Sequence, residues 1–258
     1  MPAQISTILE TINLKKSFSV GGNVVPVLKG VNVTIKNGDF LMIVGPSGSG
    51  KSTLLHTFLG LEPPSEGVTK FLNFDLYALN EDDRAEFRKK HVGIIYQQSY
   101  WIKALNVIEN VAFPLYLNGT EQNIALQKAM EELKKVGMDN WAYYYPTELS
   151  SGQQQKVGLA RALIANPLII IADEPTGNLD SKSGEALMQT LKDLNKNFGK
   201  TILMVTHDGG YVSYADRAIE IVDGLVNKEA TSGSADWGYF TGKNDKRQVK
   251  TDKVGATI

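Results

Sequence analysis

Three short runs that are apolar, apart from Thr201 at the start of the third, constrain the fold of this chain most strongly, because such strands have no polar face to offer to water. The runs cover residues 40–44, 168–172 and 201–205. Strands buried on both faces are typical of parallel sheets that are covered by helices. Apolar residues recur at helical spacing over 126–136 and 187–194, between the runs. The chain is therefore predicted to be an α/β protein with a parallel sheet.

The remaining segments have different patterns. Residues 31–35 alternate apolar and polar, which predicts an antiparallel strand in an N-terminal β part, with a turn at 21–23. Residues from about 99 to 163 contain no buried-strand run and are predicted to form an inserted helical subdomain. One domain is expected over 1–227. The polar tail 228–258 carries a charge of about +2 and is expected to be partly disordered or loosely packed.

Composition excludes several classes of function. The 27 basic and 28 acidic residues nearly cancel, so no nucleic-acid partner held by bulk charge is expected. The absence of cysteine excludes disulfides, Cys-ligated zinc and thiol catalysis. No apolar run is long enough to span a membrane, and residues 1–10 do not have the pattern of a secretory signal.

A glycine-rich segment follows the first buried run. Residues 45–53 read Gly-Pro-Ser-Gly-Ser-Gly-Lys-Ser-Thr and fill the P-loop pattern, in which backbone N–H groups and a helix N-terminus face one phosphate. The helix is expected from about 50 to 61. The alternative is a plain Gly/Ser turn before a helix. The expected phosphate-binding residues are Gly45, Pro46, Ser47, Gly48, Ser49, Gly50, Lys51, Ser52 and Thr53, of which Lys51 supplies charge and Ser52 a hydroxyl for Mg²⁺.

Charged residues also follow the other two buried runs. Asp173 and Glu174 end the second run, and His207 follows the third. Carboxyl ends of parallel strands meet at one sheet edge, so these groups are expected beside the P-loop. Asp173 is then a candidate Mg²⁺ ligand, Glu174 the group that orients or deprotonates water, and His207 a contact to the γ-phosphate. Taken singly, each also fits a loop residue without function.

The order of these motifs resembles the ATP-binding subunit of ABC transporters. The resemblance covers about residues 5–227 and includes Gln97, Leu149-Ser150-Ser151-Gly152-Gln153, which is similar to the family signature LSGGQ, and the run 175–180, Pro-Thr-Gly-Asn-Leu-Asp. It implies a P-loop NTPase core with an antiparallel β part and a helical subdomain. It also implies hydrolysis of ATP with Mg²⁺. The 175–180 run is most similar to the lipoprotein-release, macrolide-export and FtsE-like branch.

The resemblance implies a role for further residues. Two copies close head to tail around two ATP molecules, each contacted by one P-loop and by the other copy's signature, whose serines begin a helix with hydroxyls and N–H groups expected to face an anion. Phe18 matches the aromatic residue that stacks on adenine, although it also fits a core position. The implied catalytic residues are Glu174, His207, Lys51 and Gln97; the implied metal ligands are Ser52, Gln97 and Asp173; and the implied contacts across the dimer are Ser150, Gly152, Gln153 and Asp180.

Three positions depart from the family pattern. Ser151 replaces the first signature glycine, Lys156 stands where Arg is usual, and Gly158 stands where Ala is common. We expect these changes to affect the turnover rate and the dimer affinity rather than nucleotide binding, because every residue assigned to hydrolysis is present.

A membrane partner is also implied by the resemblance. In the family, a cytoplasmic helix of a permease docks on the helical subdomain, and Tyr100 and Trp101 are candidates for that contact. The alternative for Trp101 is a place in the subdomain core. The expected location is cytoplasmic, at the inner face of the membrane through the permease. The alternative functions are a soluble ABC-type ATPase acting on nucleic acid or ribosomes, and a non-hydrolysing scaffold; the single module and Glu174 argue against them.

Overall fold

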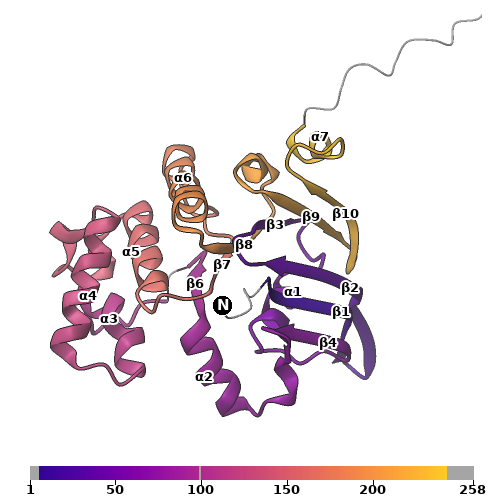
Figure 1. Cartoon of the computed structure of the whole chain (residues 1–258), viewed down its shortest axis with the longest axis horizontal. Coiled ribbons are helices and arrows are strands. Elements are labelled where there is room, and N and C mark those ends of the chain that lie inside the picture. Colours follow the sequence, from indigo (N-terminus) through magenta and orange to yellow (C-terminus); the bar gives the residue numbers. More distant parts are fainter. Residues whose placement is uncertain (1–5, 99, 243–258) are drawn as a thin grey trace, which may run out of the picture.

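The computed structural model describes residues 6–98 and 100–242. Two sheets and a separate group of helices make up the fold (Figure 1). Within the described residues, none of the helices combines the length and the apolar character needed to cross a bilayer.

The central sheet has six strands in the order β10-β9-β3-β8-β7-β6. Strand β10 is antiparallel to β9, and all other neighbours are parallel. The three predicted runs form its middle, which confirms the α/β fold with a parallel sheet; β7 begins one residue later than expected. The strands are β3 (Phe40–Val44), β6 (Val92–Tyr96), β7 (Ile169–Asp173), β8 (Thr201–Thr206), β9 (Arg217–Val222) and β10 (Leu225–Thr231).

The second sheet is antiparallel, in the order β2-β1-β4-β5, and confirms the predicted N-terminal β part. The predicted turn joins β1 to β2 by pairing Val20 with Asn23. Alternate residues of β2, among them Val31 and Val33, are buried, as the sequence pattern predicts. The sheet consists of β1 (Thr7–Val20), β2 (Asn23–Lys36), β4 (Glu66–Phe71) and β5 (Phe74–Asp75), of which the last two were not predicted.

Helix α1 (Lys51–Phe58) lies between the two sheets. Its Leu54 and Phe58 are fully buried with residues of both sheets, including Leu41 and Ile35. The helix ends three residues earlier than expected, because Gly60 adopts a left-handed φ of 68° that ends the helical path. Burial on both sides fixes the direction in which the N-terminus of α1 points.

Helix α6 (Ser181–Phe198) covers the other face of the central sheet. Its Leu187, Met188 and Leu191 pack against Met42 and Ile202 in a second buried cluster. Gly199 ends the helix in the left-handed conformation, as predicted. The sheet is thus buried on both faces, which explains why its strands carry no polar alternation.

The segment between β6 and β7 contains helices and turns only, within residues 100–163 of the described chain. It has its own buried cluster, which includes Val111, Ala129 and Leu133. In Figure 1 this group lies apart from the antiparallel sheet, beyond β6 and β7. Its helices are α3 (Val107–Leu117), α4 (Gln122–Lys135) and α5 (Ser151–Leu163).

Two further regions differ from the sequence expectations. Helix α2 (Glu81–His91) has no fully buried residue and was not predicted. The expected boundary at 227 falls inside β10, and α7 (Trp237–Thr241) packs its Trp237 against the second cluster near Tyr211 and Tyr214. Residues 228–242 are therefore folded onto the core, because apolar side chains follow the polar strand. The rest of the tail, 243–258, lies outside the described residues.

Candidate functional site

The loop from β3 to α1 forms a tightly curled cradle. Gly45 has a φ of 153°, and a Cβ there would lie 2.1 Å from the Ile221 carbonyl oxygen, so only glycine fits. Gly50 precedes α1 with a φ of 102° and offers no side chain to cap it. The first amides of α1 are therefore left without a capping side chain, as an anion site at a helix N-terminus requires.

Lys51 closes this cradle from within. Its Nζ donates hydrogen bonds to the carbonyl oxygens of Gly45 and Pro46 at 2.8 and 2.9 Å, and the residue is only 6% exposed. Burial lowers the pKa of Lys51, while the charges of Glu174 and Asp173 act in the opposite direction. Both hydrogen-bond acceptors are neutral, so a bound anion would supply a compensating charge.

Asp173 and Glu174 emerge beside the cradle at the same sheet edge. Burial raises the pKa of Asp173, the charge of Glu174 raises it further, and His56 and Lys51 lower it. The backbone of Glu174 turns sharply, with a φ of 45°, and its N–H donates to the Val205 carbonyl oxygen at 2.8 Å. A half-buried carboxylate repelled by its neighbour is a favourable place for a cation.

His207 lies against Glu174. Its Nδ1 is 2.8 Å from Glu174 Oε2, and it lines a hollow together with Gly45 and Pro46. The parallel register explains this meeting, since Asp173 is paired with Val205, and Val44 with Thr206. Residues far apart in sequence thus converge at the carboxyl ends of β3, β7 and β8.

The residues present fit a magnesium–triphosphate group. Besides the buried Lys51 ammonium, the hydroxyl of Ser49 is buried without a partner among the described residues. No cluster of three or more His, Cys, Asp or Glu side chains exists in residues 6–98 and 100–242 that would hold a metal by itself. Mg²⁺ is commonly held by one or two protein groups together with substrate phosphates, which matches a site offering Asp173 and the exposed Ser52.

Gln97 follows β6 and joins three parts of the fold. Its backbone carbonyl accepts hydrogen bonds from Gln155 Nε2 and Asn178 Nδ2, both at 3.2 Å. Its side chain lies against Gly177, where a Cβ would be 2.6 Å from Gln97 Nε2. Sequence reasoning missed Gln155. Its place in the signature helix gave no sign that its amide would reach the carbonyls of Tyr96 and Gln97.

The signature segment begins helix α5 with a reciprocal cap. The Ser150 hydroxyl accepts from the Gln153 N–H at 3.4 Å, and the Ser150 N–H donates to Gln153 Oε1 at 2.9 Å. The expectation that these groups face outward is met, since Ser150 and Ser151 are exposed. The cap satisfies the N–H groups of Ser150 and Gln153 within the chain, whereas it leaves the Ser150 O–H and the first two amides of α5 for an anion. Ser151 is the exposed first residue of the helix, a conformation open to any side chain.

Asp180 caps α6 next to the signature. It accepts hydrogen bonds from the N–H and the hydroxyl of Ser183, at 3.0 and 2.7 Å, and these bonds lower the pKa of Asp180. A Cβ on Gly152 would lie 3.1 Å from Ser183 Oγ, so α5 and α6 begin side by side. Ser150, Gly152, Gln153 and Asp180 line one groove, which shares no lining residue with the hollow at Gly45 and His207.

Three aromatic residues were also singled out in the sequence. Phe18 is half-buried on β1, with Lys16 Nζ 4.9 Å from its ring centroid. Trp101 is half-buried, donates to Gln154 Oε1 at 2.8 Å and packs under the Arg161 guanidinium. Tyr100 is 71% exposed. Of the aromatic pair, Tyr100 is thus the surface residue and Trp101 a part of the helical packing.

Known proteins of one family are similar to this chain in sequence. A family model described as ABC transporter matches residues 28–177. The lipoprotein-releasing system ATP-binding protein LolD of Geobacter metallireducens is 38% identical over 86% of this chain and 99% of its own. The macrolide export ATP-binding/permease protein MacB of Chlorobium luteolum is 41% identical over 87% of this chain. The match spans only 33% of that longer protein.

Among solved structures, the chain is similar to a cassette from Methanocaldococcus jannaschii, MJ0796. The TM-score is 0.81 with 39% identity, and the match covers 87% of this chain and 98% of that one. That structure is described as a dimer in a post-hydrolysis state, bound to ADP and Pi.

Proposed function

Since the chain belongs to the ABC transporter family of ATP-binding proteins, we propose that it works as one of two identical subunits whose ATP hydrolysis drives a membrane permease. The chain is an ATP-binding subunit and an ATP hydrolase of this family. The observation that carries the proposal is the convergence of Lys51, Asp173, Glu174 and His207 at one edge of the central sheet.

The P-loop binds the phosphates of ATP. Lys51 exchanges its contacts with Gly45 and Pro46 for phosphate oxygens, and the uncapped amides of α1 donate to the same anion. Ser52, Asp173 and Gln97 are the residues that would hold Mg²⁺. When bound, Mg²⁺ neutralises part of the charge on the phosphates.

Glu174 and His207 act on the attacking water. Glu174 orients the water and accepts its proton, while the Nδ1 contact from His207 holds the Glu174 carboxylate in place. Contact of His207 with Glu174 and with a phosphate oxygen at the same time requires an N–H on both ring nitrogens, because both partners are acceptors. A proton-accepting group that is fixed before substrate binds avoids a reorientation cost during the reaction.

A second copy completes the site. The signature groove and the P-loop hollow are separate on one chain, so a second copy would bring its signature groove to the P-loop hollow. Ser150, Gly152 and Gln153 of one copy then contact the ATP on the P-loop of the other, and Asp180 lies at the junction. The dimeric state of the similar cassette supports this arrangement.

Glu174→Gln tests the proposed function. The variant keeps nucleotide binding but loses the proton acceptor, so turnover falls by about 100-fold or more. An ATP-bound dimer then accumulates and elutes early in size-exclusion chromatography. Hydrolysis at the wild-type rate, or a monomer at saturating ATP, contradicts the assignment.

The permease docks in the α2–α3 groove, by which we mean the hollow lined by Leu61, Arg88, Tyr100, Phe113, Leu117 and Arg161. Its apolar side chains suit a helix with an apolar face. The similarity to a lipoprotein-release subunit and to a macrolide exporter supports a permease of that type, and the chain is thereby held at the inner face of the membrane.

Tyr100→Ala tests the docking site. The residue is 71% exposed, so its loss should weaken co-purification with the membrane subunit by about tenfold without unfolding the chain. Tyr143→Ala is a matched control, because Tyr143 is 74% exposed but lies outside the α2–α3 groove. Equal co-purification of both variants would remove the groove from the proposal.

A further inference from the structure

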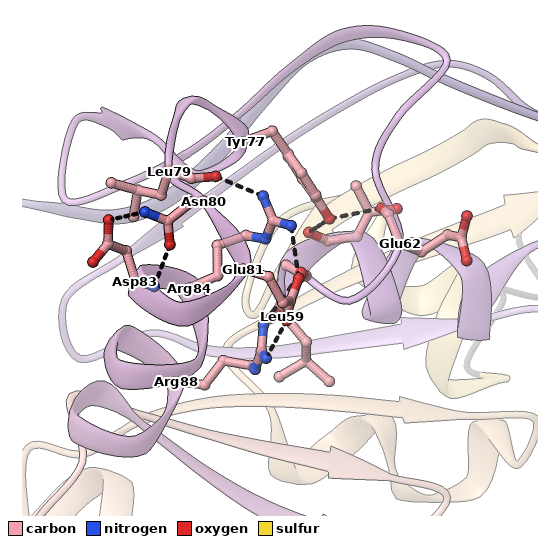
Figure 2. Close-up of polar contacts among 11 residues, drawn as sticks. Leu59, Glu62, Tyr77, Leu79, Asn80, Glu81, Asp83, Arg84 and Arg88 are labelled. Atoms are coloured by element: carbon pink, nitrogen blue, oxygen red, sulfur yellow. Dashed lines mark hydrogen bonds and ion pairs between the residues drawn. The ribbon is translucent and has the colours of Figure 1, made fainter.

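Helix α1 has two ends with different surroundings. Its N-terminus faces the phosphate site, and its C-terminus meets the segment that leads into α2 (Figure 2). Eight residues with a rise of 1.5 Å each place the two ends about 12 Å apart. A displacement of the phosphate end is therefore carried to the other end by one short, buried helix.

Two side chains hold the C-terminal end of α1. Arg88 donates through one guanidinium nitrogen to the carbonyl oxygens of Leu59 and Gly60, at 3.4 and 3.2 Å. The Tyr77 hydroxyl lies 2.9 Å from the Thr57 carbonyl oxygen and 2.6 Å from that of Glu62. Carbonyl groups at a helix end lack partners within the helix and favour a cation, so these contacts tie α1 firmly.

Glu81 fixes the direction of Arg88. The carboxylate accepts from the second nitrogen of Arg88 at 2.8 Å and from Arg84 at 2.6 Å. Arg84 also donates to the Leu79 carbonyl oxygen at 2.7 Å and lies over the Tyr77 ring. Figure 2 shows the Glu81 carboxylate between the guanidinium groups of Arg84 and Arg88. Each guanidinium is held at several points and has little freedom to swing away.

Arg88 also lines the α2–α3 groove, together with Glu86 and Lys89 of the same helix. Lys89 reaches across this groove and donates to the Leu117 carbonyl oxygen of α3 at 3.1 Å. One side chain, that of Arg88, therefore contacts both the end of the phosphate-binding helix and the surface assigned to the permease.

We propose that Arg88 is a positioning residue that couples nucleotide binding at the start of α1 to the position of α2 and thus to the shape of the α2–α3 groove. The inference rests on the proposed function only in taking the α2–α3 groove as the permease site. The coupling between α1 and α2 does not depend on that assignment. Coupling between two sites is reciprocal in free energy, so it can be measured from the nucleotide side alone.

The test uses amide hydrogen exchange of the full chain with and without a saturating non-hydrolysable ATP analogue and Mg²⁺. In the wild type, nucleotide should slow exchange in the P-loop by about tenfold or more and in α2 by about threefold. Arg88→Ala should keep the protection of the P-loop and lose that of α2. Lys90→Ala is the matched control, because Lys90 lies on the same helix and pairs only with Glu86 among the described residues; it should behave as the wild type.

A second variant guards against a mere loss of stability. Glu81→Gln changes an exposed residue, keeps the side-chain shape and weakens the hold on Arg88, so the α2 response should fall by about half. A full α2 response in Arg88→Ala, or an unchanged response in Glu81→Gln, overturns the coupling while leaving the proposed function intact. Absent P-loop protection in the wild type overturns both.

Discussion

Helices α1 and α5 each begin at a predicted contact to a nucleotide phosphate, α1 to the ATP of its own chain and α5 to that of the other copy, yet their first turns are built differently. Gly50 gives α1 no cap, and the nearby Lys51 ammonium contacts only carbonyl oxygens. Ser150 and Gln153 cap α5 from both sides. The first helix start is left unsatisfied until an anion arrives, whereas the second is stable without one.

This difference separates binding from assembly. The α1 end is preorganised within one chain, because the fold holds its amides and Lys51 in place whether or not a partner is present. The α5 end keeps the Ser150 O–H as a donor, because the hydroxyl oxygen only accepts in the cap. One chain should therefore bind nucleotide by itself at α1, and the dimer should form when the nucleotide phosphate supplies an acceptor for the α5 end of another copy.

Lys51→Ala should have the largest effect, because it removes the charged side chain at the α1 phosphate site. Removing a buried charge-assisted contact to phosphate should weaken MgATP binding by about 100-fold, since such hydrogen bonds contribute about 3 kcal/mol at most. Titration with a fluorescent ATP analogue measures the change. Affinity within about twofold of the wild type would show that α1 is not the phosphate-binding helix.

Ser150→Ala should have a smaller and different effect. Single-chain nucleotide affinity should stay within about twofold, while turnover falls by about tenfold because the contact across the dimer is lost. Loss of the cap also costs about 1 kcal/mol of folding stability. Phosphate release and nucleotide titration, run on the same sample, separate the two quantities. Equal losses in affinity and turnover would mean that α5 binds nucleotide of its own chain.

Asp173→Asn should give the smallest effect of the three variants, and it should raise the stability of the metal-free protein rather than lower a function. The raised pKa of Asp173 means that the native state holds this proton more tightly than the unfolded chain, so the associated stability is lost as the pH rises above the ordinary value of 3.8. Without metal at pH 7, the amide should raise the melting temperature by about 2 °C, a modest gain because the group is partly exposed.

The control for Asp173→Asn is the pH dependence of melting. The gain should shrink as the pH falls, because the raised pKa of Asp173 lets the native carboxyl take up its proton before the unfolded chain does, and Mg²⁺ with ATP should stabilise the wild type more than the variant. If the variant melts at a lower temperature than the metal-free wild type at pH 7, the carboxylates of Asp173 and Glu174 do not destabilise the native state by repulsion.

Much of the fold was predictable because its signals are local. The apolar runs and the glycine pattern are contiguous, and the parallel arrangement then brings Glu174 to His207 by topology. Helix α2 was not predictable, since most of its residues are charged and its contacts to the rest of the fold come from single side chains, such as Phe87 on Phe71 and Arg88 on the Leu59 carbonyl oxygen. The cap on α5 was not predicted, because a serine at a helix start fits both a cap and an anion contact.

The boundary at 227 was misplaced for a related reason. Polar composition signals a solvated segment, but β10 is an edge strand with one exposed face, and Trp237 and Phe240 anchor the helix that comes after it. Trp237 and Phe240 stand among polar residues and give only a weak helical periodicity, although aromatic side chains contribute much apolar surface when they pack.

The anchoring of α7 has a practical consequence for any shortened version of the chain. Trp237 and Phe240 pack on the short 3-10 helix Gly209–Tyr214, which begins two residues after His207. Ending the protein at Thr231 would uncover Tyr211 and Tyr214 and loosen the segment that carries the histidine. Such a truncation would also remove Tyr239 and Phe240 from the hollow at Gly45 and His207, so it would lower activity while leaving Lys51, Asp173 and Glu174 in the chain.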